Sequence, residues 1–219
     1  MNKSVPSQGF TLIEMMVVVS IVAVMAAVAV PGLVRWSETQ RVRSAGQSLA
    51  GAFMLAHGEA IRTGDLHIVF FQTDAQGNTL LDGDGAAVPI LVINDGRPGS
   101  ANQNCRIDAG EMIAAVRAES GVSWGVTAAT LKVPSDSGTG DIDTGSSFTD
   151  TASVAASWTM FRPEGTPVSF TPACVVGGTG SGAGGAYVTN GQRDYAAVLL
   201  PLGGVHVHAW NSASGSWSN

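Results

Sequence analysis

The N-terminal part of the chain is a polar segment followed by a long apolar one. The first nine residues are polar overall, and Met15–Val30 contains no charged side chain. A helix from Phe10 to Val30 would be about 30 Å long, close to the thickness of a bilayer's hydrocarbon core. Glu14 is the one acid inside this apolar stretch. The pattern predicts a transmembrane helix over residues 10–34.

A second helical pattern follows, with apolar residues on one face only. Between residues 41 and 62 they recur every three or four positions, at Val42, Ala45, Leu49, Phe53, Ala56, Ala60 and Ile61. This spacing predicts an amphipathic stem helix over residues 35–63 that covers a sheet with its apolar face. Gly64 is a suitable residue to end it.

Pro31 and Gly32 separate the two helical patterns. Proline removes a helix hydrogen bond and glycine weakens the local helix, so we expect a kink or a short unwound stretch here. Arg35, Arg41 and Arg43 follow and mark the aqueous edge of the membrane segment.

After Gly64 short apolar runs alternate with turn residues such as Asn94-Asp95-Gly96. The runs predict strands at Leu66–Phe71, Pro89–Ile93, Met112–Val116, Ser157–Phe161, Val168–Phe170, Tyr195–Leu200 and Val205–Trp210. Many short strands without crossover helices indicate an antiparallel sheet or sandwich. We therefore predict an α+β fold, with the long N-terminal helix packed on a β-rich head over residues 64–219. Glycine- and serine-rich stretches at 135–147, 177–185 and 212–219 are expected to be surface loops.

Composition and charge restrict the functional class. The chain has 219 residues with 45% hydrophobic and 13% charged side chains, which excludes a disordered chain. The net charge is −6, and from Gly64 onward six basic residues face fourteen acidic ones, a net charge of −8. No lysine or arginine follows Gly204. A nucleic-acid partner held by bulk charge is therefore disfavoured.

Glu14 distinguishes between three interpretations of the apolar segment: a plain anchor, a secretory signal peptide cut near Ala26–Ala29, and a prepilin-type leader. A carboxylate at the centre of a membrane helix costs about 2.5–3.5 kcal/mol on insertion scales, and less near the helix end. An anchor or a signal peptide has no use for the acid. It therefore suggests a partner for Glu14, the alternative being an acid that reaches the headgroups.

The sequence Gly9-Phe10-Thr11-Leu12-Ile13-Glu14 follows a short polar leader over residues 1–9 and precedes an apolar helix. It resembles the signal of type IV pilins and of type II secretion pseudopilins. The resemblance implies that a prepilin peptidase cleaves between Gly9 and Phe10 and that the new N-terminus, Phe10, is methylated. It also implies that Glu14 pairs with the N-terminal amine of a neighbouring subunit, which offsets the cost of burying both charges.

The same resemblance implies a location and partners. The chain would be a single-pass protein of the inner membrane, surrounded by lipid before assembly, with its head in the periplasm. It would then enter a pilus or pseudopilus fibre, with other major and minor pilins and the inner-membrane assembly platform as partners. Because only Lys3 precedes the helix, this orientation runs against a simple positive-inside count.

The stretch Leu55–Arg62 is similar to the end of the stem helix in GspH/FimT-type minor pilins, although His57 and Gly58 depart from the usual pattern. We therefore expect a structural minor pilin of a type IV pilus or pilus-like fibre. The alternatives are a GspH-like pseudopilin of a type II secretion system and a FimT-like DNA-uptake pilin, which the acidic head disfavours. A tip adhesin and an anchored periplasmic enzyme belong to other classes, and no catalytic constellation supports the enzyme.

The chain has two cysteines, Cys105 and Cys174. If the resemblance holds and the head is periplasmic, two such cysteines usually pair. We therefore predict a Cys105–Cys174 disulfide. Two unpaired thiols remain the alternative, because sequence spacing cannot show that the sulfur atoms meet.

Two acidic loops raise the question of calcium. Asp82 and Asp84, like Asp141 and Asp143, place carboxylates two residues apart, and calcium prefers such oxygen clusters. An EF-hand loop would need a glutamate where this chain has Gly85. We expect solvated acidic loops, with calcium as a possible ligand.

Two further features are weighed as cofactor sites. His206 and His208 alternate on a predicted strand and so share one face, but no third zinc ligand is near in sequence. Residues 180–185 match a dinucleotide-binding glycine pattern, but no helix pattern follows them. We expect no bound metal or other cofactor and no enzymatic activity.

Overall fold

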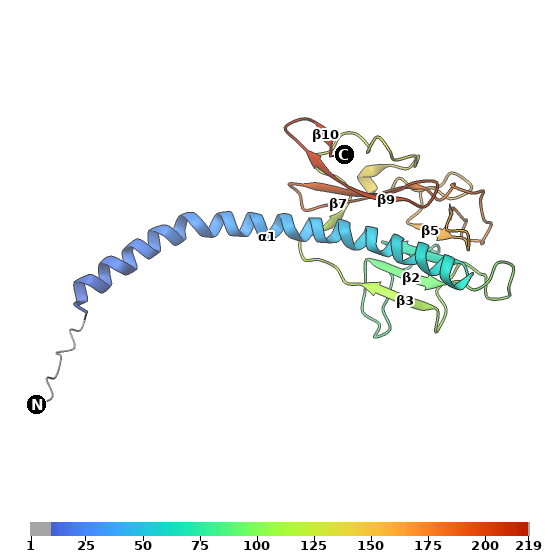
Figure 1. The fold of residues 1–219 in the computed structure, drawn as a ribbon, viewed down its shortest axis with the longest axis horizontal. Helices are drawn as coiled ribbons and strands as arrows, with labels where there is room; N and C mark the ends of the chain where they lie inside the picture. Colours follow the sequence, from blue (N-terminus) through green and yellow to red (C-terminus); the bar gives the residue numbers. More distant parts are fainter. Residues whose placement is uncertain (1–9, 219) are drawn as a thin grey trace, which may run out of the picture. The chain divides into compact units, whose positions relative to one another are not determined.

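The computed structural model describes residues 10–218 of the chain. One helix, α1 (Leu12–Thr63), precedes ten strands and a short 3-10 helix, η1 (Ile142–Thr144) (Figure 1). The strands are β1 (His67–Phe71), β2 (Ile90–Asn94), β3 (Met112–Val116), β4 (Ser123–Trp124), β5 (Trp158–Phe161), β6 (Pro167–Val168), β7 (Gly184–Thr189), β8 (Asp194–Leu199), β9 (Val205–Asn211) and β10 (Ser216–Trp217). The chain forms two compact units, Met1–Glu38 and Thr39–Asn219. The predicted boundary within the helix, between residues 34 and 35, stays a prediction.

The described residues of the first unit include the apolar part of α1, from Leu12 to Val34. The one serine of this part, Ser20, donates its hydroxyl to the carbonyl of Met16 at 2.7 Å, so the polar group is satisfied within the helix. Pro31 and Gly32 are both helical, so the expected unwound stretch is absent from this described helix. Proline has a φ compatible with a helix, and it removes one donor, the partner of the Ala27 carbonyl. A kink at this point stays a prediction.

The second half of α1 packs against the sheets. Its buried residues are Val42, Gly46, Leu49, Ala50, Ala52, Phe53, Ala56 and Ala60. The predicted face is correct except that Ala45 is half-buried and Ile61 is exposed. Gly46, which the pattern had missed, lets the helix approach β8, since a Cβ there would lie 3.3 Å from the Cβ of Tyr195. The helix ends as predicted: Gly64 has φ +74° and donates its N–H to the Ala60 carbonyl at 3.0 Å.

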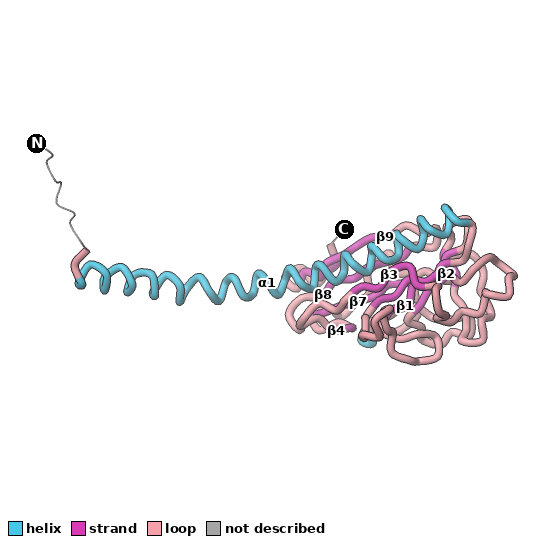
Figure 2. The backbone as a smooth tube through the Cα atoms, turned by 90° about the horizontal axis from the view of Figure 1, so that it is seen from below, coloured by secondary structure: helices cyan, strands magenta, loops and turns pink. Residues whose placement is uncertain are grey.

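The strands form two five-stranded antiparallel sheets. The first has the order β3-β2-β1-β5-β6 and the second β10-β9-β8-β7-β4. In the second unit the helix lies along strands of both sheets (Figure 2). The predicted α+β class, with a long helix on antiparallel β structure, is confirmed.

Aromatic rings join the helix to both sheets in one core. The Phe53 ring of α1 lies 6.1 Å from Phe71 of β1 and 5.8 Å from Phe148, and the last two rings are 5.3 Å apart. Strand β8 contributes Ala197 and Leu199 to this core. Its alternate residues face a second, smaller cluster, formed by Ala129, Val133, Tyr187, Ala196, Val198, Trp210 and Trp217. Strand β8 is therefore buried on both faces.

Two of the stretches predicted to be surface loops contain strand residues with buried side chains or backbone, so those predictions were wrong. Strand β7 begins at Gly184, and all six of its residues are buried. A Cβ on Gly184 would lie 2.9 Å from the Phe148 ring, so the glycine is required by packing. Strand β10 lies in the stretch 212–219, where Trp217 is 8% exposed and its indole donates to the Leu131 carbonyl at 2.7 Å.

Candidate assembly site

The N-terminal end of α1 is closed by a capping box. The backbone N–H and the hydroxyl of Thr11 each donate to Oε2 of Glu14 at 2.9 Å. In return the N–H of Glu14 donates to the Thr11 hydroxyl oxygen at 3.3 Å. This reciprocal pair satisfies backbone donors that have no partner inside the helix. The Thr-x-x-Glu spacing is a sequence signal for such a capping box. The sequence prediction for Glu14 was instead a charge pair with the N-terminal amine of a neighbouring subunit.

The predicted processing residues lie directly before this cap. Phe10 is 84% exposed, whereas Gly9 lies outside the described residues, so cleavage between them stays a prediction. Were the chain cut there, its new amine would be on the residue that precedes Thr11. The terminus and the Glu14 carboxylate would then lie within one helical turn of each other in sequence. The arrangement presents a carboxylate, and after cutting also an amine, at the tip of an apolar rod.

The sides of this rod are an uncovered apolar surface. Every large hydrophobic residue from Phe10 to Val34 is at least 51% exposed. By length and composition the helix could cross a membrane. A surface of this extent is unfavourable in water, so lipid or other apolar helices must cover it.

The head contains the predicted disulfide between Cys105 and Cys174, with the Cα atoms 5.3 Å apart. Cys105 is fully buried, and Cys174 is half-buried. Both residues have a left-handed backbone, with φ of 57° and 60°. A carboxylate oxygen of Asp95 and the two sulfur atoms all lie within 4.8 Å of one another. Because both sulfurs are bonded, the cluster is a disulfide with an acid beside it, a feature that the sequence analysis missed.

Asp95 follows β2 and is fully buried. Its Oδ1 accepts the backbone N–H of Asn104 at 3.2 Å and that of Cys105 at 2.9 Å, while Oδ2 has no hydrogen-bond partner within residues 10–218. Burial raises the pKa of the carboxyl from 3.8 to about 6. The two N–H groups lower this pKa in part, and the charges of Glu111 and Asp108 raise it further.

The predicted acidic loops have a structural role in the described head. Asp82 accepts the N–H groups of Asp84 and Ala86 on one oxygen at 3.0 and 2.8 Å, which closes a hairpin loop. Gly85 has φ +80° at the fourth position of this loop. The loops that begin at Asp74 and Asp150 repeat these hydrogen bonds. The first aspartate of each loop therefore has backbone hydrogen-bond partners of its own, and calcium binding stays a prediction.

The second acidic pair also has a local role. Asp141 caps η1 and accepts the N–H of Asp143 at 3.0 Å. The carboxylate therefore satisfies a donor at the start of a helical turn, as is usual for a capping aspartate.

His206 and His208 share one face of β9, as their spacing predicted. Their rings are stacked, with centroids 6.2 Å apart and planes at 21°. Nδ1 of His208 lies 2.5 Å from the carbonyl oxygen of Ser218. Among the residues that the structure describes, the one group of three metal-ligating side chains within reach of one another is Asp95 with the two cysteines. The histidine pair is thus not part of such a group.

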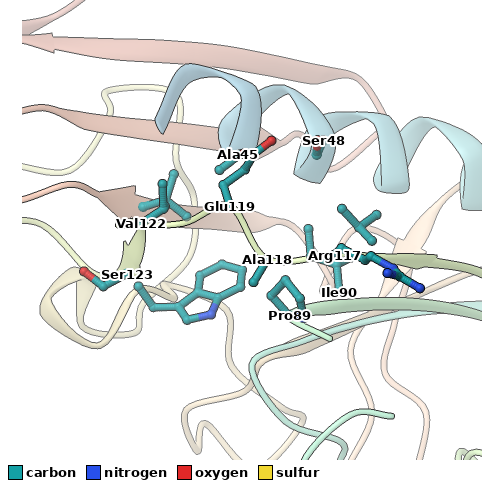
Figure 3. Close-up of a pocket in the computed structure, with 12 residues that line it drawn as sticks. Ala45, Ser48, Pro89, Ile90, Arg117, Ala118, Glu119, Val122 and Ser123 are labelled. Atoms are coloured by element: carbon teal, nitrogen blue, oxygen red, sulfur yellow. The ribbon is translucent and has the colours of Figure 1, made fainter. Parts of the chain in front are cut away.

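A small apolar cavity lies between α1 and the segment that connects β3 to β4. Figure 3 shows Ala45 and Ser48 of the helix on one side of it and Pro89 and Ile90 on the other. Its volume is about 50 Å³, too small for a cofactor. Glu119, at its rim, accepts a hydrogen bond from the Ser44 hydroxyl at 3.0 Å and so joins the helix to this segment.

Residues 6–30 match the family model described as the prokaryotic N-terminal methylation motif. The motif is a type IV pilin-like prepilin signal, so the chain carries the N-terminal signal of a pilin-like or pseudopilin protein. No curated protein matches the chain. No solved structure matches it either.

Proposed function

We propose that this chain is a structural minor pilin, cut between Gly9 and Phe10 by a prepilin peptidase and methylated on Phe10. The mature subunit is added to a type IV pilus or pilus-like fibre. The observation that carries the proposal is the methylation motif at residues 6–30, which covers most of the apolar first part of α1, where every large hydrophobic side chain from Phe10 to Val34 is exposed.

The uncovered helix defines the order of events. Before assembly, lipid of the inner membrane covers the apolar surface from Phe10 to Val34, and the head lies in the periplasm. In the fibre, apolar helices of neighbouring pilins replace the lipid. The platform that extracts the subunit must therefore keep this surface out of water at every step.

Glu14 has two roles in this proposal. Within its own subunit the carboxylate caps the helix through Thr11. In the fibre it also pairs with the methylated amine of a neighbouring Phe10, and this charge pair sets the register of the incoming subunit. A buried charge is costly without a partner, so a subunit without the pair would be added less readily.

The head supports a structural role rather than an enzymatic one. Three of the four buried acids in the described head, Asp74, Asp150 and Asp194, accept backbone N–H groups and so hold loops in place. The GspH/FimT-type resemblance of residues 55–62 favours a minor subunit. The head charge of −8 argues against the DNA-uptake branch of that group.

Three variants separate the charge of Glu14 from its capping role. Glu14→Gln keeps a side chain that can cap the helix but removes the charge. Glu14→Ala removes both, and Thr11→Ala removes the cap but keeps the charge. We expect both Glu14 variants to be cut and inserted in the membrane but to be at least about tenfold depleted from sheared fibres, in line with the loss of a buried charge pair.

Thr11→Ala is the control, and we expect it to enter fibres at close to the normal level. Mass spectrometry of the fibres and of the cell envelope measures the amount and identifies a peptide that starts at N-methylated Phe10. Normal incorporation of Glu14→Gln would contradict the pairing role. A chain that still carries residues 1–9, or one cut near Ala29, would contradict the whole proposal.

A pseudopilin of a type II secretion system is the second candidate, since the same signal is used there. Its distinguishing result is a methylated Phe10 peptide that is found only in the envelope. Deletion of the chain would then abolish secretion of folded exoproteins and leave surface pili intact.

A further inference from the structure

The cluster of Asp95, Cys105 and Cys174 has a feature that a purely structural disulfide does not need. The Asp95 carboxylate is fully buried, and its Oδ2 lacks a hydrogen-bond partner among the described residues. An unpaired buried carboxylate oxygen is costly, so its retention beside two sulfur atoms needs a reason. One carboxylate oxygen of Asp95 and the two sulfur atoms lie within 4.8 Å of one another, so the carboxylate is an acid–base group next to the disulfide.

The two cysteines differ in access, and the difference assigns them different roles. Cys174 is half-buried and lies in a hairpin loop between exposed residues Ala173 and Val175. Cys105 is fully buried. An external oxidant therefore reaches the Cys174 sulfur first, and the Cys105 thiol must close the bond from inside. A thiol buried in apolar surroundings ionises with difficulty, so Cys105 requires a base.

We propose that Asp95 is the built-in general base that closes the Cys105–Cys174 disulfide. In the closing step its carboxylate accepts the proton of the Cys105 thiol, and the Cys105 sulfur attacks the Cys174 sulfur of a mixed disulfide with a thiol oxidant. The bond between the two cysteines forms. The bond to the oxidant breaks, and its sulfur leaves with the electron pair as a thiolate.

The step balances with a disulfide as the oxidant. The two thiols of the chain are oxidised, and the oxidant disulfide is reduced to two thiols. The proton taken up by Asp95 is released to the leaving thiolate or to solvent. By microscopic reversibility, protonated Asp95 returns a proton to Cys105 when a dithiol opens the bond.

The surroundings of Asp95 suit a base at neutral pH. The titratable and charged side chains on the segments hydrogen-bonded to Asp95 or next to it in sequence are Asp65, His67, Arg97, Arg106, Asp108 and Glu111. Glu111 and Asp108 raise its pKa, and Arg97 lies 3.8 Å from Asp65. With a pKa of about 6 the carboxyl is mostly ionised at pH 7 yet basic enough to take a proton.

The test follows closure of the reduced full-length chain in detergent micelles by oxidised glutathione. Samples are quenched by alkylation, and mass spectrometry quantifies reduced, glutathionylated and closed chains over pH 5 to 10. A Cys105→Ala variant shows whether glutathione adds to Cys174. We compare the wild type with Asp95→Asn, which keeps the shape of a protonated aspartate.

We expect the closing rate constant of Asp95→Asn to be about 100-fold below wild type at pH 7, the lower end of the range for general base catalysis. The wild-type rate should fall as the pH drops through about 6. The variant rate should instead rise continuously with pH, because it depends on the unassisted ionisation of the Cys105 thiol, so that the gap between the two rates narrows as the pH increases.

Asp194→Asn is the matched control, because Asp194 is also fully buried and accepts backbone N–H groups, but on the second sheet. It should close at the wild-type rate. Equal rates for Asp95→Asn and wild type at every pH would overturn the proposal. A slowing of the same size at every pH would also overturn it, because a structural defect does not follow the ionisation of a carboxyl.

Discussion

Asp95 loses its hydration on folding and recovers two backbone hydrogen bonds, both on Oδ1. Its pKa rises from 3.8 to about 6, which means that the folded head binds a proton more tightly than the unfolded chain does. The charged form therefore destabilises the head at neutral pH. The same cost supplies the basicity that the proposed closing step uses, so stability and function are opposed at this residue.

Because the charged Asp95 carboxylate destabilises the folded head, the stability difference between wild type and Asp95→Asn should depend on pH. Urea denaturation with the disulfide intact measures this difference. The carboxyl is protonated in both folded and unfolded states below about pH 3.8, and its cost is complete above about pH 6. Each pKa unit corresponds to about 1.4 kcal/mol, so the whole shift is worth about 3 kcal/mol. Relative to the variant, the wild type should lose about 2 kcal/mol of this between pH 4 and pH 7.5. If the difference in unfolding free energy stayed constant over this range, ionisation of Asp95 would not destabilise the folded head.

Strand β7 lies between β8 and β4 in the second sheet, although it begins in a glycine-rich stretch. Strands rarely contain glycine, so local composition favours a loop. Packing reverses this preference, because the Phe148 ring occupies the space that a Cβ on Gly184 would need. The glycine allows the ring to reach Phe53 of the helix and so joins the sheet to α1.

Two substitutions in this stretch test the packing argument. Gly184→Ala should lower the free energy of unfolding by about 1–3 kcal/mol, since the Cβ would lie 2.9 Å from the Phe148 ring. Gly178→Ala is the control: no atom lies within 4 Å of its added Cβ, and a change of about 0.5 kcal/mol at most is expected. Thermal or urea denaturation of both variants measures the difference. Equal stability of the two variants would contradict a packing role for Gly184.

Across the whole molecule, the hydrophobic pattern of the sequence was sufficient to predict an element wherever its buried residues follow a simple pattern. The stem face around Leu49 and Phe53 could be predicted because its apolar residues recur every three or four positions. Strand β1 (His67–Phe71) could be predicted because it lies in a short, nearly continuous apolar run, and all its residues are buried. Strand β7 and Gly46 could not, because their glycines are explained by neighbours distant in sequence. The same limit applies to the sites: Glu14 stands in a local motif, whereas Asp95 meets the cysteines only in the fold.

The disulfide is the one covalent cross-link between distant parts of the head, and its two cysteines have a sequence separation of 69. In the chain-entropy model such a closure stabilises the folded state by about 4 kcal/mol. Cys174 occupies the left-handed position of its hairpin loop, where the loops at Asp74 and Asp82 have glycine. The bond therefore also holds a backbone conformation that most residues avoid.

Two double variants separate the effect of loop closure from that of the left-handed backbone at position 174. Both carry Cys105→Ala; one combines it with Cys174→Ala and the other with Cys174→Gly. Both should lose about 4 kcal/mol of stability from the missing bond. The glycine variant should be about 1 kcal/mol more stable than the alanine variant, because alanine is strained at φ +60° and glycine is not. Urea denaturation of the two variants beside the wild type gives both numbers. If the alanine variant were the more stable of the two, the left-handed backbone at position 174 would not be strained, and the disulfide would not be needed to maintain it.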